Sequence, residues 1–447
     1  MIIGGGITGL AAAHKLTEIE NDNICPEVIL IESKNRLGGI IETKYHNDCI
    51  LELGPDAFIT QKPWALALCR RLGFEDKLIN TNSERRKTLI VKNGELVPLP
   101  EGFYLLAPGK VPPLFESNIL SREGKVRMAI EYFLPPKTTD TDETLAQFVR
   151  RRFGEEALTR IAQPMVGGIY GGDPEKLSLK AIMPRFLEME KEEGSVIKAL
   201  LKQKSTGDTG ARYSMFVTPE KGFQSLLDEL EKQVEKKTKI LKNTCVKKIE
   251  KGYSQSLYSV ITSNATIETD SIILAIPSFA ASALLIDIDS ELSQLTGTIE
   301  FSSSAIINFL FDSSKLPEDL DGFGFVVPYI EKLTMMACTF TSIKFPNRTK
   351  EKYFAMRAFL GGLLQEDVLK DDDQTLISKV LEELQTLLKT RATPLFSELT
   401  RYPHSMPQYN TGHLELVDKI ESLEKANPGL ALCGNSYRGV GIPDSIK

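Results

Sequence analysis

The stretch MIIGGGITGLAAAHKL, residues 1–16, decides the fold of this chain. Ile2 and Ile3 are typical of the end of a buried strand, and the pattern Gly-x-Gly-x-x-Gly follows them directly, before an alanine-rich helix. Glycines at this spacing permit a tight turn, close approach of a pyrophosphate and close packing of helix on strand. The free N–H groups at the start of the helix favour an anion. The segment therefore predicts a dinucleotide site formed by Gly4, Gly5, Gly6, Ile7, Thr8 and Gly9.

A second strand and an acid follow in the order that such a site requires. The run VILIE, residues 28–32, is apolar and β-branched and ends in Glu32. Glu32 follows Gly9 at close to the spacing of about 20 residues expected for a carboxylate that accepts the ribose hydroxyls. An acid at this position also disfavours a ribose that carries a 2′-phosphate. A dinucleotide without that phosphate is the expected ligand.

The residues after the acid indicate which dinucleotide binds. The sequence ESKNRLGG, residues 32–39, resembles the extension found in flavoproteins of the amine oxidase and glutathione reductase type. Paired glycines let a second backbone segment approach the phosphates, and Arg36 adds positive charge. We expect Arg36, Gly39 and Ile40 to lie along the phosphates of FAD.

Composition limits the class of protein. The chain has 447 residues, too many for one core, and we expect two or three domains. A net charge of −6 disfavours binding to nucleic acid, and no apolar run is long enough to span a membrane. The six cysteines and four histidines lack the spacing of metal ligands, so we predict no metal and a cytoplasmic protein. Because Gly4 must lie inside the fold we expect no signal peptide, and the short segments at both ends suggest a natural chain that extends further.

The pattern of elements predicts an α/β fold with a cofactor domain split by two insertions. The family resemblance given below implies a doubly wound FAD-binding domain, a sheet-based substrate domain and a helical insertion. A hairpin turning at Asn93-Gly94 and a helix over 375–390 are further expectations. We expect a discontinuous FAD-binding domain over 1–60, 214–282 and 400–447, a substrate-binding domain over 61–99, 182–213 and 283–399, and a helical domain over 100–181.

The predicted helical domain carries aromatic residues beside basic ones. Two interpretations are open: the aromatics form an ordinary bundle core, or they rest on a membrane surface. We favour the core and keep peripheral contact with the inner face of the cell membrane as the alternative. The aromatics in question are Phe103, Tyr104, Phe115, Tyr132 and Phe133.

Distant motifs point to one family. The segments VGGIYGGDPEKLSL (residues 166–179) and GNSYRGVGIPD (residues 434–444), with GGGITGL, ESKNRLGG, ELGPDAF and MPQYNTGH, resemble the bacterial protoporphyrinogen and coproporphyrinogen III oxidases. Together they cover nearly the whole chain. The resemblance implies an enzyme of heme synthesis that oxidises a porphyrinogen to the porphyrin by hydride transfer to FAD. Dioxygen would be the electron acceptor and would yield H2O2.

The resemblance also assigns roles to residues. It places Glu32 and Ser33 at the adenosine ribose and Val246 at the adenine. It implies no catalytic side chain, because the flavin takes the hydride, and no metal. Two further groups would contact the flavin: the turn of Gly54, Pro55, Asp56 and Ala57, and the helix start at Gly441, Ile442, Pro443 and Asp444.

A porphyrinogen is large, mostly apolar and edged by carboxylates, so its pocket should be apolar with cations at the rim. Ile169, Tyr170 and Phe359 are the candidates for its lining, and Arg86 and Lys87 for its rim. The sequence does not separate protoporphyrinogen from coproporphyrinogen, nor a monomer from a homodimer. A flavin amine oxidase and a non-enzymatic carrier on the same fold are the alternatives.

Overall fold

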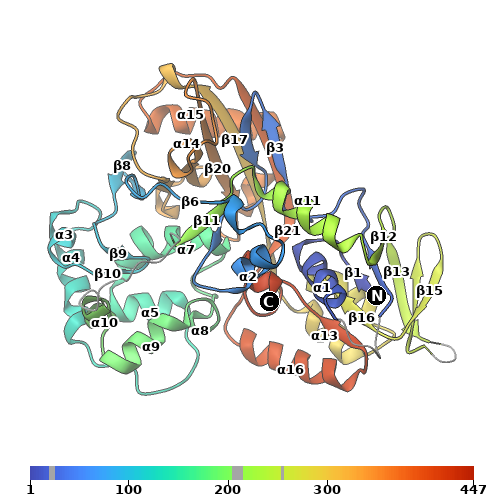
Figure 1. The fold of residues 1–447 in the computed structure, drawn as a ribbon. Coiled ribbons are helices and arrows are strands. Elements are labelled where there is room, and N and C mark those ends of the chain that lie inside the picture. The colour runs from blue at the N-terminus through green and yellow to red at the C-terminus, as the bar shows by residue number, and fades with distance from the viewer. Residues whose placement is uncertain (20–25, 204–214, 253–255) are drawn as a thin grey trace.

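The computed structural model of the protein describes residues 1–19, 26–203, 215–252 and 256–447. Figure 1 shows three lobes: one around a parallel sheet, one around a larger mixed sheet, and one made of helices.

The first lobe contains a five-stranded parallel sheet. The strand order is β12-β2-β1-β16-β22, with Ile2 opposite Leu30 on one side and Ile273 on the other. Strands in the middle of such a sheet are buried on both faces, which explains their β-branched, uniformly apolar sequences. The strands are β1 (Ile2–Ile3), β2 (Val28–Ile31), β12 (Thr238–Leu241), β16 (Ile272–Leu274) and β22 (Leu430–Leu432).

Helices cover both faces of this sheet. Leu10 and Leu226 pack against Ile2 on one face, and Leu284 and Val417 pack in the cluster around Ile3 on the other. The first face is covered by α1 (Ile7–Thr17), α2 (Trp64–Arg71), α11 (Phe223–Val234) and α17 (Ile442–Ile446). The second is covered by α12 (Ser278–Leu285), α13 (Ser290–Gly297), α16 (His413–Ala426) and a small sheet of β13 (Val246–Lys251), β14 (Tyr258–Thr262) and β15 (Thr266–Thr269). This confirms the doubly wound fold.

The second lobe is built on a seven-stranded mixed sheet, in the order β21-β17-β20-β19-β18-β7-β8. Its strands are β7 (Leu89–Lys92), β8 (Glu95–Pro98), β17 (Phe301–Asp312), β18 (Gly324–Val326), β19 (Met335–Phe340), β20 (Tyr353–Gly361) and β21 (Phe396–Pro407). On β20, Met356, Ala358 and Leu360 pack toward α15 (Asp373–Leu387), so the residues between them face the opposite side. That opposite face turns toward the first lobe.

The predicted hairpin and helix of this lobe are confirmed. β7 and β8 are joined at Asn93 and Gly94, whose φ angles of 53° and 77° are those of a tight hairpin turn. β21 was not anticipated, because Pro403 lies within it. The strand tolerates this proline at the edge of the sheet, beside a register shift between Ser302 and Ser304.

The remaining short elements lie within or between the lobes. They are β3 (Thr43–His46) with β4 (Cys49–Glu52); β5 (Phe58–Ile59) with β11 (Phe216–Pro219) and β6 (Leu78–Asn80); β9 (Phe103–Tyr104) with β10 (Ala107–Pro108); α14 (Thr341–Lys344); and the single turns η1 (Glu75–Lys77), η5 (Ser313–Lys315), η6 (Tyr329–Glu331) and η7 (Glu366–Lys370).

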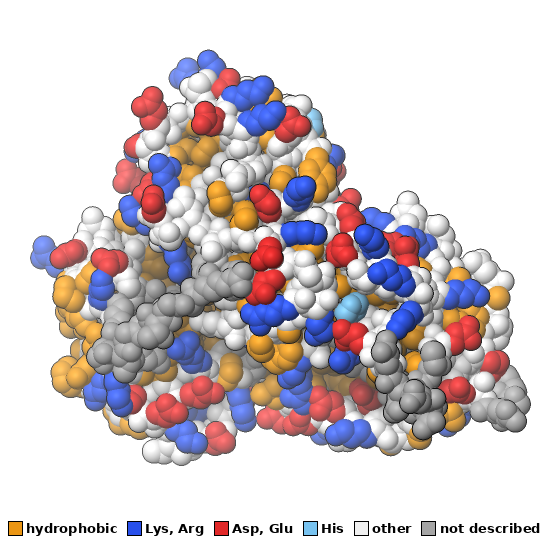
Figure 2. Space-filling model, viewed as in Figure 1, with side chains coloured by type: hydrophobic (Ala, Val, Ile, Leu, Met, Phe, Trp, Pro, Cys, Tyr) orange, Lys and Arg blue, Asp and Glu red, His pale blue; other side chains and the backbone are white. Residues whose placement is uncertain are grey.

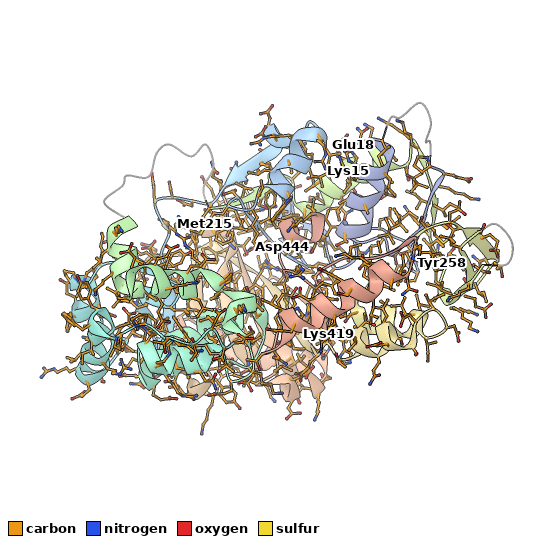
Figure 3. All side chains as sticks on the ribbon, turned by 90° about the horizontal axis from the view of Figure 1, so that it is seen from below. Lys15, Glu18, Met215, Tyr258, Lys419 and Asp444 are labelled. Carbon is orange, nitrogen blue, oxygen red and sulfur yellow. The ribbon has the colours of Figure 1, made fainter. Side chains whose placement is uncertain are left out.

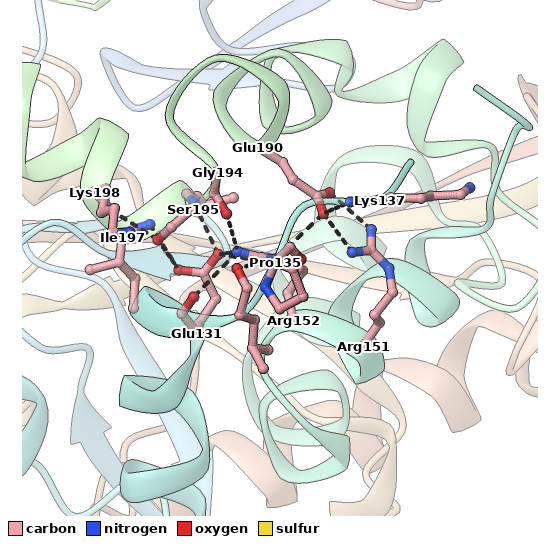
Figure 4. Close-up of polar contacts among 12 residues, drawn as sticks. Glu131, Pro135, Lys137, Arg151, Arg152, Glu190, Gly194, Ser195, Ile197 and Lys198 are labelled. Carbon is pink, nitrogen blue, oxygen red and sulfur yellow. Dashed lines mark hydrogen bonds and ion pairs between the residues drawn. The ribbon is translucent and has the colours of Figure 1, made fainter. Parts of the chain in front are cut away.

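The third lobe is helical. It contains α3 (Pro112–Glu116), α4 (Arg122–Ala129), η2 (Ile130–Phe133), α5 (Leu145–Arg152), α6 (Glu155–Ala157), η3 (Leu158–Ala162), α7 (Gln163–Tyr170), α8 (Leu179–Ile182), α9 (Pro184–Glu193) and α10 (Val196–Gln203). Glu131 and Arg152, both fully buried, form an ion pair at its centre. Glu131 also accepts hydrogen bonds from Ser195 and from the backbone N–H of Val196 and Ile197, so it caps α10 (Figure 4).

The packing clusters differ from the expected boundaries in four places. Helix α2 packs on the parallel sheet, although we expected residues 61–99 in the substrate domain. Helices α9 and α10 pack with the helical lobe, although we expected residues 182–213 in the substrate domain. Helices α12 and α13 pack on the parallel sheet, and β21 starts at Phe396 in the mixed sheet. We therefore propose boundaries near 203, 300 and 407 instead of 181, 282 and 399; residues 204–213 lie outside the described residues.

Among the described residues, none of the helices combines the length and the apolar character needed to cross a bilayer.

Candidate functional site

The glycine turn has the geometry of a phosphate-binding loop. A Cβ on Gly9 would lie 1.9 Å from the carbonyl oxygen of Gly4, so α1 packs on the turn too closely for any side chain there. Gly4 has a φ of 107°, which favours glycine. A Cβ on Gly6, in contrast, would meet no atom within 4 Å. Gly6 is the N-cap of α1 and no side chain caps the helix, so an anion could use the N–H groups of the first turn, which include Ile7 and Thr8.

Glu32 lies at the end of β2, beside this turn. One of its oxygens accepts from the backbone N–H of Gly5 at 2.8 Å, and the other accepts from the N–H of Lys34 at 2.8 Å and the hydroxyl of Ser33 at 3.1 Å. The side chain is buried. Glu32 therefore holds the turn and the strand end together at the position where the sequence places the ribose.

Val246 lies near the same strand end. The N–H of Thr244 donates to the backbone oxygen of Glu32 at 3.0 Å, and the N–H of Glu32 donates to Leu241 at 2.9 Å. Val246 begins β13 two residues beyond Thr244. The structure thus brings the predicted ribose and adenine residues together.

Arg36 shapes its own loop. Its guanidinium donates to the carbonyl oxygens of Leu37, Gly39 and Ile41 at 2.7–3.1 Å and pairs with Glu42 at 2.7 Å. We expected a charge directed at phosphates, whereas these contacts direct it at backbone carbonyls. The sequence motif predicted a loop beside the glycine turn but did not predict these contacts of the guanidinium.

The loop that Arg36 shapes lies directly on the glycine turn. The N–H of Gly38 donates to Gly5 at 2.8 Å, and a Cβ on Gly39 would lie 3.3 Å from the Cα of Gly6. Ile40 is 49% exposed. Two glycine-rich backbones therefore flank the open space beside Gly6, which is the arrangement that an extended pyrophosphate requires.

The Gly54 turn forms the next layer. A Cβ on Gly54 would lie 2.1 Å from the carbonyl oxygen of Ile40, so Gly54 and the residues Pro55 and Ala57 on its turn follow directly on the Ile40 loop. Burial alone would raise the pKa of Asp56, but Lys344, 2.9 Å away, and Arg357, 3.1 Å away, lower it to about 2. Asp56 is therefore ionised and fixed between two cations.

The start of α17 completes the set. α17 begins at Ile442 with Gly441 as its N-cap and Pro443 in its first turn, and it packs between α1 and α2. Both oxygens of Asp444 lie 2.7 Å from the ammonium of Lys62, which follows the Gly54 turn in sequence. Figure 3 shows Asp444 near the centre of the molecule.

Tyr170 joins the helical lobe to this centre. Burial raises the pKa of Tyr170 to about 12, and the negative charge of Asp444 adds to the shift, so the two residues are close enough to interact. The hydroxyl of Tyr170 donates to Ile182 at 3.0 Å. Ile169, its neighbour, is 43% exposed. The carbonyl of Gly171 accepts from Leu363 at 2.8 Å, which ties this segment to the end of β20.

Phe359 lies on β20, on the face of the mixed sheet turned away from α15, with the Arg357 guanidinium 5.1 Å from its ring centre. The predicted rim cations are exposed at the surface. Arg86 contacts the sulfur of Met215 at 3.6 Å, and Lys87 pairs with Asp321 at 2.6 Å. Within the described part of the chain, neither cation forms a hydrogen bond or an ion pair with the predicted lining residues.

Sequence reasoning missed several polar residues of this region. Asn308 and Arg357 are almost completely buried, although each lies in an apolar strand sequence, AIINFLF and AMRAFL. A single polar residue inside an apolar strand is the signal that could have identified them. Arg348, Lys344 and Tyr402 gave no such signal.

Comparisons with known proteins agree with this geometry. Residues 7–447 match the family described as flavin containing amine oxidoreductase. The chain belongs to this family. The match confirms an oxidoreductase and the expectation of FAD as its cofactor.

Relatives of known name cover the whole chain. Coproporphyrinogen III oxidase of Bacillus subtilis is 35% identical over 100% of this chain and 95% of its own length. That of Staphylococcus aureus is 31% identical over 100% and 96%. The chloroplastic protoporphyrinogen oxidase 1 of Arabidopsis thaliana is 26% identical over 100% and 86%.

A solved structure has the same fold. A protein of Exiguobacterium sp. 255-15, assigned as a protoporphyrinogen oxidase, superposes with a TM-score of 0.87 at 27% identity, covering 100% of this chain and 95% of that one. Reduced UDP-galactopyranose mutase, at 16% identity and a TM-score of 0.72, shares the fold alone.

Proposed function

We propose that this protein oxidises coproporphyrinogen III to the porphyrin in heme synthesis, with FAD as cofactor and dioxygen as electron acceptor. The observation that carries the proposal is the 35% identity with the coproporphyrinogen III oxidase of Bacillus subtilis over the whole chain. The plant protoporphyrinogen oxidases match over the same length at lower identity, which favours coproporphyrinogen as the substrate.

The cofactor would lie along the layered backbone segments described above. The residues proposed to hold it are Gly4, Gly5, Gly6, Ile7, Thr8, Gly9, Glu32, Ser33, Arg36, Gly39, Ile40, Gly54, Pro55, Asp56, Ala57, Val246, Gly441, Ile442, Pro443 and Asp444. The open space beside Gly6, between two glycine backbones, supports this fit.

When bound, FAD would supply the chemistry: it would accept hydride from the porphyrinogen in repeated two-electron steps until the porphyrin forms, and each step would return two electrons and two protons to O2 as one H2O2. The protein's part is to orient the macrocycle and to exclude water. Ile169, Tyr170 and Phe359 offer apolar surface for this purpose. Tyr170 is protonated at neutral pH because its pKa is about 12, so it packs as a neutral ring and is no base.

Substrate carboxylates would stay at the rim, where water and cations are available. Arg86 and Lys87 are both exposed, as such a role requires. Lys87 would have to exchange Asp321 for a carboxylate of the substrate, since the two are paired at 2.6 Å.

The test is direct. The FAD-loaded protein is mixed with coproporphyrinogen III or with protoporphyrinogen IX in air, and porphyrin fluorescence and H2O2 are followed. We expect faster oxidation of coproporphyrinogen III, with H2O2 formed in proportion. Faster oxidation of protoporphyrinogen IX would reverse the substrate assignment. Oxidation of a primary amine alone would support the amine oxidase alternative, and a purified protein without flavin absorption would support the carrier.

We also propose that this enzyme is cytoplasmic and touches a membrane with its helical lobe. Phe133 is 79% exposed, and Val126 and Ile130 are exposed and four residues apart on one helical face. The ammonium of Lys198 lies 4.8 Å from the ring of Tyr132. Figure 2 shows hydrophobic side chains gathered beside lysines and arginines at this end of the molecule. Apolar side chains among cations fit an anionic lipid surface.

Of the five aromatics considered from the sequence, Phe103 and Tyr104 pack against the helical core, whereas Phe115, Tyr132 and Phe133 are exposed. Sedimentation with vesicles that contain anionic lipid, and not with zwitterionic ones, is expected. Phe133→Ser should weaken it, and equal sedimentation of the variant would refute the contact.

A further inference from the structure

Three successive backbone carbonyls, the last of them that of Gly54 in the Gly54 turn, each accept a hydrogen bond from a side chain of the mixed sheet. Asn308 donates to the oxygen of Glu52 at 3.1 Å, the hydroxyl of Tyr402 donates to that of Leu53 at 2.7 Å, and Arg357 donates to that of Gly54. The three donors come from three adjacent strands, β17, β21 and β20. We call Asn308, Arg357 and Tyr402 the clamp.

The register of the sheet explains why these side chains meet one segment. Asn308 lies directly opposite Arg357 across the β17–β20 pair, and both lie on the face away from α15. Asn308 has no exposed surface and Arg357 only 2%. Burial raises the pKa of Tyr402 to about 12, so its hydroxyl remains a donor at neutral pH. Each donor therefore acts inside the protein, where an unmet carbonyl would be costly.

Arg357 connects two parts of the candidate site. Its guanidinium pairs with Asp56 on the Gly54 turn, and it lies 5.1 Å from the ring of Phe359 on the same strand. The ammonium of Lys344 also pairs with Asp56, at 2.9 Å. A displacement of β20 would thus be transmitted to the turn through one rigid, planar group.

A buried arginine is a poor means of gaining stability. Replacing a buried ion pair by well-packed apolar residues is often neutral or stabilising. Arg357 also leaves its Nε without a partner, as Asn308 leaves its side-chain oxygen. The geometry is therefore better explained by the need to fix the position of a backbone segment than by the need to stabilise the fold.

We propose that Asn308, Arg357 and Tyr402 are positioning residues that set the Gly54–Ala57 turn against the flavin. They join the cofactor turn to the strand that carries Phe359. This inference rests on the proposed FAD site, because it assigns the turn to the flavin.

The sharpest test removes one hydroxyl. Tyr402→Phe keeps the ring and loses only the hydrogen bond to Leu53. The matched control is Tyr258→Phe, since the hydroxyl of Tyr258 also donates to a backbone carbonyl, that of Pro428, at 2.7 Å. Figure 3 shows Tyr258 toward one end of the molecule, away from Asp444 near its centre. The FAD dissociation constant, the visible circular dichroism of bound FAD, and the melting temperature are measured for each.

We expect Tyr402→Phe to weaken FAD binding about two- to tenfold, the ratio that one hydrogen bond supports, and to change the visible spectrum of the flavin. Tyr258→Phe should change the melting temperature alone. A second pair of variants, Arg357→Lys and Arg152→Lys, compares two buried arginines in the same way. Only Arg357→Lys should alter the flavin spectrum.

Equal flavin spectra and equal FAD affinities for both members of each pair would overturn the positioning role and leave the clamp as a feature of stability. Wild-type protein that fails to bind FAD would instead overturn the proposed function, and this inference with it. The two failures are thus distinguished by the wild-type protein.

Discussion

Glu32→Gln should damage both the glycine turn and the binding of FAD. In the structure, the two carboxylate oxygens of Glu32 each accept a backbone N–H, from Gly5 and from Lys34, both at 2.8 Å. A glutamine offers one oxygen and one NH2 group, so one of the two N–H donors would face another donor. Hydrogen bonds to charged groups contribute about 1.5–3 kcal/mol each, so we expect the protein without cofactor to lose about 2 kcal/mol.

A second loss appears only with the cofactor present. If Glu32 also accepts the ribose hydroxyls, the variant should bind FAD about 10- to 100-fold more weakly. Thermal unfolding without FAD measures the first effect, and fluorescence titration with FAD measures the second. The control is Glu42→Gln, which removes a half-exposed ion pair with Arg36 worth about 0–1 kcal/mol. A Glu32→Gln variant with the melting temperature and FAD affinity of the wild type would refute this account of the turn.

Three further outcomes are expected. Gly6→Ala should keep the melting temperature of the wild type but bind FAD weakly, because its Cβ would meet no protein atom within 4 Å. Gly9→Ala should lower both the melting temperature and the FAD affinity, because its Cβ would lie 1.9 Å from the carbonyl oxygen of Gly4. Calorimetry and FAD titration compare the two variants, and equal behaviour would contradict the packing argument. The pKa of Asp56 is lowered from 3.8 to about 2, so the contribution of its carboxylate to the free energy of unfolding is complete above pH 4 and is lost as the pH falls toward 2. The stability advantage of the wild type over Asp56→Asn should therefore shrink by about 2 kcal/mol across that window. Denaturation at each pH checks this; Asp48→Asn, at a surface ion pair, serves as control, and a constant advantage would refute it. Arg86→Glu should raise the KM for coproporphyrinogen at least about threefold, less so in high salt, with kcat unchanged, and an unchanged KM would remove Arg86 from the rim.

Local sequence patterns were enough to predict the glycine turn, its neighbouring strand end and the hairpin. The glycine turn, Glu32 and the Asn93-Gly94 hairpin each depend on a few neighbouring residues, whose backbone preferences are visible in the sequence. The sequence predicted a doubly wound parallel sheet but not the order of its strands, because β12 and β22 come from distant parts of the chain.

What escaped prediction depends on long-range register. Whether Arg357 faces α15 or the cofactor turn follows from the pairing of β20 with β17, and a shift by one residue would reverse it. Similarly, Arg36 was assigned to phosphates from its charge, but its contacts with the carbonyls of its own loop depend on how residues 37–42 curl. The packing of α9 and α10 with the helical lobe likewise depends on tertiary contacts, including those with the buried Glu131.

The strand order of the parallel sheet has a consequence for folding during synthesis on the ribosome. β1 pairs with β16, and the backbone nitrogen of Met1 donates to a carbonyl 270 residues later in the chain. β22 and α17, which complete the sheet and its cover, are synthesised later still. The glycine turn is therefore synthesised long before β16, β22 and α17, the elements that pack beside it in the folded protein. If FAD binds at the proposed site, it would be loaded only after β22 and α17 have been synthesised, and until then the unpaired edges of β1 and β2 would be open to aggregation.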